Sequence, residues 1–446
     1  RARSFVSGLL PGPLHSETFV PLAAPVVAFT SDLPVLLIHH FDRGRPSANT
    51  DTYASVQLYE PDTNGVTSLT NLPSLTSRAI VAARGSSTEG NSKVSLKVEF
   101  QDELGFGRSV KLLGMPADPD WVLYAPNNFE PILIHNPFAH QLSRDIGRYS
   151  PRTRFVEVYL VQKGLGPVAQ SSYFGIYVLE EKIKLDDNRV DAPKLFSGQN
   201  QLPDISGGYL MKIDRPDPGD GGFYAANQGV LYVSPKEEEI VQPDRTAQRN
   251  YLQNYMDGFG SALYGENYRD PVQGYRAYVD VGSWIDHHWL NVLTFNVDAL
   301  RLSAYFYKQR EGKLHFGPLW DFDRALYSTD GRDAQANTWR STVGDLGTDF
   351  FNYPWWDRMF TDPDFFQTYI DRYQELRLTH FSTTNLTRLV DDLTGEVRQA
   401  QPREFAKWHY QRASNSTYDG EIRLLKTWLS LRTAFFDSQF VSPPSF

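Results

Sequence analysis

The chain has 446 residues, enough for a large hydrophobic core and one to three domains. Hydrophobic residues make up 41% and aromatic residues 14%, which indicates a folded globular protein and excludes a disordered one. The net charge of −9 argues against a nucleic-acid-binding protein, and the absence of cysteine excludes disulfides, cysteine-ligated zinc and thiol catalysis.

The apolar runs and the first residue of the chain indicate whether it spans a membrane or carries a signal peptide. No apolar run reaches the roughly 18 residues that cross a bilayer, so we expect no membrane span. The chain begins at Arg1 rather than Met, so we expect its true start, and any signal peptide, to lie upstream.

The first part of the chain, to about residue 126, alternates short apolar runs with Gly, Pro, Ser and Asn. The runs at 33–41, 78–85 and 93–100 predict strands. The segment 136–149 has apolar residues at helical spacing and a proline in its first turn, so it predicts a helix.

The middle of the chain predicts further strands and a loop-rich excursion. Alternating residues at 154–162 and 172–184, and the apolar run at 207–214, are typical of strands. Residues 185–245 are rich in Asp, Pro and Gly, which indicates loops.

Helical periodicity dominates after residue 244 and continues through most of the segment 355–440. Strands followed by helices indicate an α+β protein, and we expect two lobes with a cleft between them. The predicted parts are an N-terminal extension at 1–30, a strand-rich lobe at 31–243 and a helical lobe at 244–446.

Two carboxylates flank a predicted hairpin in the helical part. Asp298 follows a predicted helix at 281–297, the runs 303–309 and 313–320 form the hairpin, and Asp321 comes directly after it. A hairpin can bring its two ends close together, so we expect the two aspartates to be neighbours.

The order helix, Asp, hairpin, Asp is also the order in protein kinases. There one Asp positions the substrate hydroxyl and the second holds Mg²⁺ on the phosphates. Mg²⁺ prefers carboxylate and phosphate oxygens, which explains the residue type. Two loop aspartates in water, or a local ion pair between Asp323 and Arg324, account for the same residues without a metal.

The run "NVDALRLSAYFYKQREGKLHFGPLWDFDRAL" resembles the CotH kinase family of spore-coat-protein-like atypical kinases. Similar blocks, in the family's order, are "ARGSSTEGNSKVSLKVEF", "DWVLYAPN", "PRTRFVEVYL", "YFGIYVLEEKIKLDDNRV" and "GGYLMKID". The resemblance implies an atypical protein-kinase-like, two-lobed fold and a secreted or cell-surface bacterial protein. It also implies ATP with Mg²⁺ or Mn²⁺ as cofactors and a protein substrate phosphorylated on Ser or Thr.

The resemblance also implies roles for individual residues. Asp298 matches the family's N-x-D block and would accept or orient the hydroxyl proton of the substrate. Asp321 matches the first Asp of the W-D-F-D block and would bind Mg²⁺, with Asp323 as a further carboxylate. Ser303 stands where many kinases have a metal-binding Asn, and its hydroxyl is a weaker ligand.

Cationic residues are needed for the nucleotide phosphates. The loop "RGSSTEGNSK" could present backbone N–H groups to phosphate, with Arg84 and Lys93 as its side-chain ligands. Glu181 is the candidate partner of the nucleotide-binding lysine. A plain hairpin turn and a solvent-facing Glu181 are the alternatives, and Lys97 and Lys111 compete with Lys93 for the phosphate role.

Three functions therefore stand after reading the sequence. The first is a Mg²⁺/ATP-dependent protein Ser/Thr kinase. The second is a coat or surface interaction protein that keeps a kinase-like fold with little catalysis, as Ser303 favours. The third is a carbohydrate-binding or hydrolytic protein using paired aspartates. The adjacent histidines of "DHHW" (286–289) point about 100° apart on a helix, which disfavours a shared zinc ion.

Overall fold

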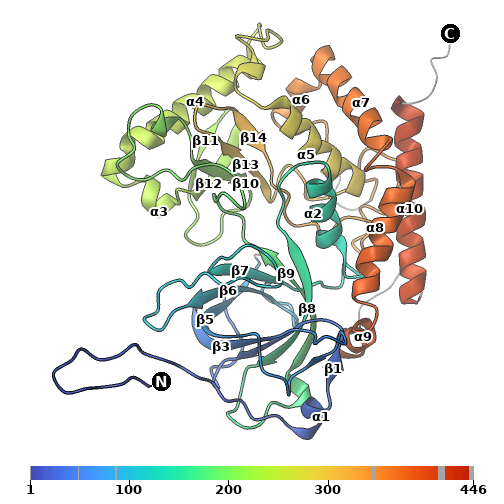
Figure 1. Cartoon of the computed structure of the whole chain (residues 1–446). Helices are drawn as coiled ribbons and strands as arrows, with labels where there is room; N and C mark the ends of the chain where they lie inside the picture. The colour runs from blue at the N-terminus through green and yellow to red at the C-terminus, as the bar shows by residue number, and fades with distance from the viewer. Residues whose placement is uncertain (1, 49, 86–87, 344–347, 410–416, 441–446) are drawn as a thin grey trace. The chain divides into compact units, whose positions relative to one another are not determined.

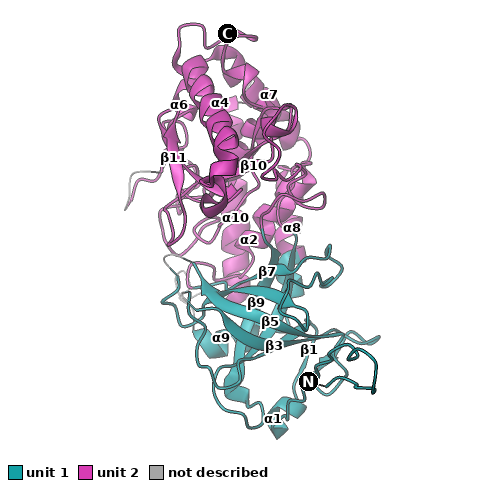
Figure 2. Ribbon diagram, turned by 90° about the vertical axis from the view of Figure 1, so that its left-hand side faces the viewer, with its two compact units in different colours: residues 1–127, 152–182, 393–410 teal, residues 128–151, 183–392, 411–446 magenta. Residues whose placement is uncertain are grey.

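The computed structural model describes residues 2–48, 50–85, 88–343, 348–409 and 417–440. The chain combines sheets with many helices, in agreement with the predicted α+β class (Figure 1). It divides into two compact units (Figure 2). Unit 1 contains residues 1–127, 152–182 and 393–410, and unit 2 contains residues 128–151, 183–392 and 411–446. This division does not coincide with the boundary predicted at residue 243, because each unit is assembled from three separate segments.

Unit 1 is built around a closed barrel of seven strands in the order β2-β3-β5-β6-β7-β9-β8. The strands are β2 (Val35–His39), β3 (Thr52–Tyr59), β5 (Leu75–Arg84), β6 (Ser95–Gln101), β7 (Asp120–Tyr124), β8 (Thr153–Val161) and β9 (Tyr173–Glu181). Neighbouring strands are antiparallel except β2 and β8, whose parallel pairing closes the barrel.

Alternation along the barrel strands explains its core. In β5 and β6, residues such as Val81 and Val98 lie opposite each other and are buried, as are Leu123 and Leu179 of β7 and β9. Side chains with period two point to one face of a strand, so the strands together fill the barrel interior. The strands predicted at 78–85, 93–100, 154–162 and 172–184 are confirmed.

Smaller elements complete unit 1. They are α1 (Ala24–Val27), the paired short strands β1 (Thr30–Ser31) and β4 (Thr67–Ser68), the 3₁₀ turn η1 (Gln170–Ser172) and helix α9 (Gln401–Trp408). Helix α9 lies against β9, and its Trp408 Nε1 donates to the carbonyl of Phe174 (2.8 Å). A segment from near the end of the chain is therefore part of the barrel unit.

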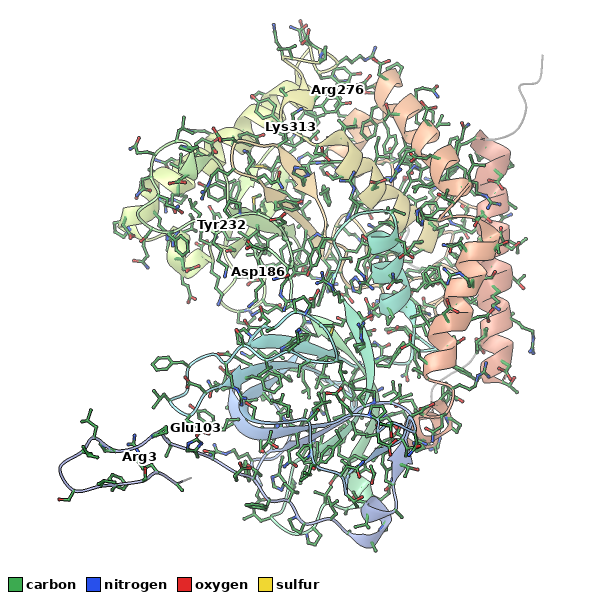
Figure 3. The ribbon with its side chains drawn as sticks, in the orientation of Figure 1. Arg3, Glu103, Asp186, Tyr232, Arg276 and Lys313 are labelled. Atoms are coloured by element: carbon green, nitrogen blue, oxygen red, sulfur yellow. The ribbon has the colours of Figure 1, made fainter. Side chains whose placement is uncertain are left out.

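Unit 2 contains a five-stranded sheet in the order β11-β12-β10-β13-β14. Its strands are β10 (Tyr209–Ile213), β11 (Gly222–Ala225), β12 (Gln228–Ser234), β13 (Ala304–Lys308) and β14 (Leu314–Phe316). The helical elements of unit 2 between β10 and α5, and the turn before β10, are η2 (Asp204–Ser206), α3 (Glu237–Ile240), η3 (Pro243–Arg245), α4 (Thr246–Tyr264) and η4 (Tyr275–Ala277). The turn of the β13–β14 hairpin is tied to η4, since the Lys313 Nζ donates to the Arg276 carbonyl (2.6 Å; both are labelled in Figure 3).

Helix α5 (Val281–Thr294) forms the centre of unit 2. Every residue from Ser283 to Thr294 is buried, which is expected of a helix surrounded by other elements. Asp280 caps its start, because the Asp280 carboxylate accepts from the N–H of Ser283 (2.8 Å). The other helices are α2 (His135–Asp145), α6 (Trp356–Met359), α7 (Pro363–Arg377), α8 (Thr383–Glu396) and α10 (Tyr418–Phe440). No helix in the described ranges has the length and apolar character needed to cross a membrane.

Candidate functional site

Asp298 lies on a turn just past the C-terminus of α5, as predicted. The helix ends at Thr294, and Phe295 adopts a left-handed backbone (φ 52°), a common way for a helix to stop. Asn296 then bonds back to the helix: its N–H donates to the Asn291 carbonyl (3.0 Å) and its Nδ2 to the Asn291 Oδ1 (3.1 Å). These bonds fix the segment that carries Asp298.

Asp321 follows the predicted hairpin, which the structure confirms. Strands β13 and β14 are antiparallel, with Phe306 opposite Phe316. Beyond β14, the N–H of Gly317 donates to the carbonyl of Tyr305 (2.7 Å), which keeps the chain along β13. The N–H of Phe322 donates to the Asn136 Oδ1 (2.9 Å), so the residue after Asp321 is anchored to α2.

Asn296 joins the two aspartate segments. Its side-chain Oδ1 accepts from the N–H of Asp298 (3.2 Å), and its Nδ2 lies 3.4 Å from the backbone carbonyl of Asp321. One amide side chain thus contacts the backbone of both residues. The hairpin brings its two ends together, and Asp298 and Asp321 belong to one cluster within unit 2.

The backbone of this cluster is unusually strained. Left-handed backbone angles occur at several residues that are not glycine: Leu300 (φ 67°), Ser303 (φ 50°), Asp321 (φ 65°), Leu326 (φ 58°) and Tyr327 (φ 62°). Each such residue costs of order 1 kcal/mol or more unless its surroundings impose it, and such residues concentrate at functional sites. The strain supports a functional role for these loops.

Ser303 and Asp321 are direct neighbours. The Ser303 Oγ lies 3.5 Å from the Asp321 Oδ2, at the outer limit of a hydrogen bond. Asp321 is solvent-exposed. The structure therefore brings together two of the three residues that the sequence analysis assigned to a metal ion.

Asp298 lies beside two arginines. Its Oδ1 is 3.1 Å from the Arg301 Nη2 and 4.0 Å from the Arg332 Nη1. Arg332 is also held by Asp330 (2.5 Å). The Asp298 side chain remains 24% exposed, so the arginines compensate its charge without enclosing it.

Asp323 differs from Asp321 in being buried (8% exposed). Its backbone carbonyl lies 3.4 Å from the Nδ1 of His135 on α2. Among the residues that the structure describes, no three His, Asp or Glu side chains form a group suited to hold a metal ion. A divalent cation at Asp321 and Ser303 would need further oxygen ligands, as Mg²⁺ bound between carboxylate and phosphate oxygens has.

Lys93 has a different environment from the one predicted. Its side chain is 3% exposed, and its Nζ donates to the carboxylate of Glu404 on α9 (2.6 Å) and to the backbone carbonyls of Ile176 (2.6 Å) and Pro126 (3.3 Å). Its Nζ also lies over the Tyr177 ring, 5.1 Å from the centroid. In this conformation the ammonium group serves contacts internal to unit 1, and its role as a phosphate ligand stays a prediction.

Glu181 is not the partner of Lys93, which corrects the predicted pairing. The Glu181 carboxylate is fully buried and accepts two hydrogen bonds from the Arg152 Nη1 (2.8 and 3.1 Å). It also accepts from the N–H of Arg152 (3.0 Å). Both residues are at an end of the β8–β9 pair, so strand pairing determines the partner of Glu181. The acidic partner of Lys93 is instead Glu404, which lies 311 residues away in sequence.

Arg84 ends β5, opposite Ser95 of β6, so "RGSSTEGNSK" does connect two paired strands. Gly85 has a left-handed backbone (φ 106°), and an added Cβ would lie 2.2 Å from the Thr88 Oγ1. Residues 86–87 of this loop lie outside the described residues. Of the competing lysines, Lys97 pairs with Asp51 (2.7 Å) on the barrel surface.

Sequence reasoning missed Asn296 and Glu404. Asn296 was within reach, since it is the first residue of the N-x-D block that drew attention to Asp298. No local pattern distinguishes Glu404 from the other acidic residues of the C-terminal helices.

Comparison with known proteins identifies a family. The family model described as "CotH kinase protein" matches residues 81–436, which include both aspartate segments, the end of β5 and the barrel strands from β6 onward. No curated protein matches the chain. Since the family model covers well over half of the sequence, the chain belongs to the CotH kinase family.

Proposed function

We propose that this protein is an atypical kinase that transfers the γ-phosphoryl group of ATP to a Ser or Thr hydroxyl of a secreted or cell-surface bacterial protein. The observation that carries the proposal is the Asn296 bridge, which holds the Asp298 and Asp321 backbones in one cluster. Kinases need one carboxylate for the acceptor hydroxyl and another for the metal that binds the phosphates. Family membership supports the same activity.

Asp298 is the proposed catalytic residue. Its carboxylate accepts or orients the proton of the acceptor hydroxyl while the hydroxyl oxygen forms a bond to the γ-phosphorus. The bond from that phosphorus to the β–γ bridging oxygen breaks, and ADP leaves with the electron pair. Arg301 holds the Asp298 carboxylate at 3.1 Å and limits its rotation toward other positions.

Asp321 and Ser303 are the proposed protein ligands for Mg²⁺ or Mn²⁺. When bound, such an ion supplies positive charge to the phosphate oxygens. The anchoring of Phe322 to Asn136 and the left-handed backbone of Asp321 fix the position of this carboxylate. Asp323 is buried next to His135, so we propose that it supports the loop more than it binds the ion.

One observation favours a second function, a coat or surface interaction protein with weak catalysis. The Nζ of Lys93 is enclosed and has three acceptors inside unit 1. If phosphate binding requires this lysine, one of these three acceptors must give up its contact when a nucleotide binds.

Phosphate transfer from γ-labelled ATP with Mg²⁺ or Mn²⁺ tests the proposal. We would follow autophosphorylation and transfer to a generic basic protein, with Asp298→Asn, Asp321→Asn and, as a control, Asp371→Asn. Asp371 is an exposed residue of α7 whose carboxylate accepts from the Gln367 Nε2 (2.8 Å). Loss of a positioned base typically costs about 10²- to 10⁴-fold in rate.

We expect label with the wild type and Asp371→Asn, and its near-complete loss in the other two variants. Absence of label from the wild type, together with no stabilisation by ATP and Mg²⁺ in thermal unfolding, would favour the interaction protein. Full activity of Asp321→Asn would contradict the metal role of that residue.

A further inference from the structure

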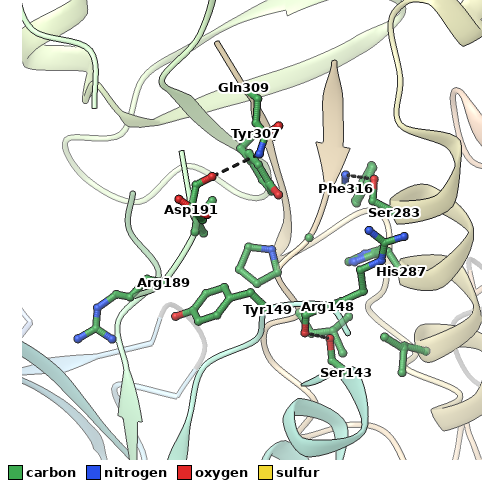
Figure 4. A pocket seen from close by; sticks show the side chains of 15 residues that line it. Ser143, Arg148, Tyr149, Arg189, Asp191, Ser283, His287, Tyr307, Gln309 and Phe316 are labelled. Carbon is green, nitrogen blue, oxygen red and sulfur yellow. Dashed lines mark hydrogen bonds between the residues drawn. The ribbon is translucent and has the colours of Figure 1, made fainter. Parts of the chain in front are cut away.

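Unit 2 contains a cavity of about 120 Å³ that none of the candidate site residues lines. The end of α2, the middle of α5, strand β13, the segment 316–319 and the segment 189–191 form its walls (Figure 4). A water molecule occupies about 30 Å³ in the liquid, so the space corresponds to about four waters or one small polyatomic ion.

Arg148 supplies hydrogen-bond donors to this cavity. Its Nε donates to the Asp286 carboxylate (2.6 Å), which holds the guanidinium in place. The Asp280 carboxylate lies 3.9 Å from the Arg148 Nη1, close enough for an ion pair but beyond hydrogen-bond distance. The two Nη groups make no hydrogen bond within the described residues, and the side chain is 37% exposed.

His287 adds a buried polar atom to the same cavity. The residue is 5% exposed, and its Nδ1 has no hydrogen-bond partner in the described part of the chain. Burial lowers the pKa of His287 to about 3, so the ring is neutral at physiological pH, and one tautomer donates from Nδ1. The adjacent His288 is fully bonded, to Tyr369 and Phe350, so the unpartnered atom is specific to His287.

The remaining polar lining is mixed in charge. The buried side chain of Arg189 lines the cavity, and the exposed Asp191 is its one carboxylate. The Gln309 Nε2 donates to the backbone carbonyl of Asp191 (3.3 Å), which ties that segment to the end of β13. The Nη groups of Arg148 and the unpartnered Nδ1 of His287 are the polar atoms that favour an anion inside the cavity.

We propose that this cavity binds a small oxyanion, a phosphate or a carboxylate. An arginine offers parallel N–H donors whose spacing matches two oxygens of such a group. The Nη groups of Arg148 bind the oxyanion, and the Nδ1–H of His287 donates to it. Neither Asp298 nor Asp321 lines this cavity, so the proposal does not depend on kinase activity.

Isothermal titration of the full chain tests the proposal, with inorganic phosphate and malonate as separate probes and sodium chloride at equal ionic strength as the blank. Phosphate binding alone identifies a phosphate site, and malonate binding alone a carboxylate site. We expect saturable binding of at least one probe. Arg148→Met should weaken it roughly 10- to 100-fold, as expected for lost charge-assisted hydrogen bonds.

The variants separate local folding effects from binding. Arg148→Lys keeps a cation near Asp286 but lacks the fork, and His287→Phe keeps a ring but lacks Nδ1, so both should bind more weakly. Arg388→Met, on the exposed face of α8, and Asp321→Ala should bind like the wild type. The proposal would be overturned if neither probe showed saturable binding. It would also be overturned if Arg148→Met and His287→Phe both bound with the affinity of the wild type.

Discussion

Replacing Glu404 with Gln should strongly destabilise the barrel unit. The wild-type carboxylate lies 2.6 Å from the Lys93 Nζ, with the two side chains 0% and 3% exposed, and it also accepts from the N–H of Ile176 (2.6 Å). Gln can keep one of these contacts, but it leaves the lysine charge buried without a counterion. Removing one partner of a buried ion pair costs about 3–5 kcal/mol.

Calorimetric unfolding measures this cost. One kcal/mol shifts the midpoint of a domain of this size by roughly 2–4 °C, so a loss of about 6–20 °C is expected for the transition of unit 1. Asp51→Asn is the matched control, because it breaks the Lys97–Asp51 pair, whose side chains are about half exposed. Breaking an exposed pair costs about 1 kcal/mol or less.

The double variant Lys93→Met, Glu404→Leu tests whether the unpaired lysine charge causes the loss of stability. It removes both charges and should recover much of the lost stability, because an apolar pair needs no counterion. If Glu404→Gln is no worse than Asp51→Asn, the buried pair does not hold α9 on the barrel, and the reasoning fails.

Three further predictions concern single residues. Asn296→Ala should lower kcat roughly 10-fold or more with little change in KM, while circular dichroism stays unchanged, because it releases both aspartate backbones; a change in KM alone would contradict a positioning role. Burial raises the pKa of Asp333 to about 7 from 3.8, so the folded state keeps a proton that the unfolded state releases. As the pH rises from about 4 to 7, the free energy of unfolding should therefore fall by about 1.4 kcal/mol per pH unit. Asp333→Asn should remove that slope in urea titrations. Gly175→Ala should lower the melting temperature far more than Gly164→Ala: both glycines have left-handed backbones, but only at Gly175 would the new Cβ lie 1.9 Å from the Glu404 Oε2.

Local patterns predicted most strands, because alternation records which face of a strand is buried. They could not predict that β2 pairs in parallel with β8, since this contact joins segments more than a hundred residues apart. They also missed the β11–β12 hairpin. Its two-residue turn, Ala226-Asn227, has left-handed angles (φ 50° and 64°), and alanine is a weak signal for such a turn.

The sequence likewise predicted some residues of the candidate site and not others. Asp298, Asp321 and Ser303 lie around one hairpin, so sequence order was enough to predict that they are neighbours. The partners of Lys93 and Glu181 were not predictable, because an ion pair depends on which distant element covers a buried charge. Helix α9 has an ordinary amphipathic sequence that does not indicate the surface it covers.

The origin of α9 has a consequence for the newly made protein. Ribosomes add about 5–20 residues per second, so the 311 residues between Lys93 and Glu404 take roughly 15–60 s to synthesise. Once residue 181 has been added, all the barrel strands exist, but the counterion of Lys93 and the helix that covers β9 have still to be made. Unit 1 should therefore mature only after residue 404 has been added, and nascent chains halted before that residue should be sensitive to proteases and dependent on chaperones.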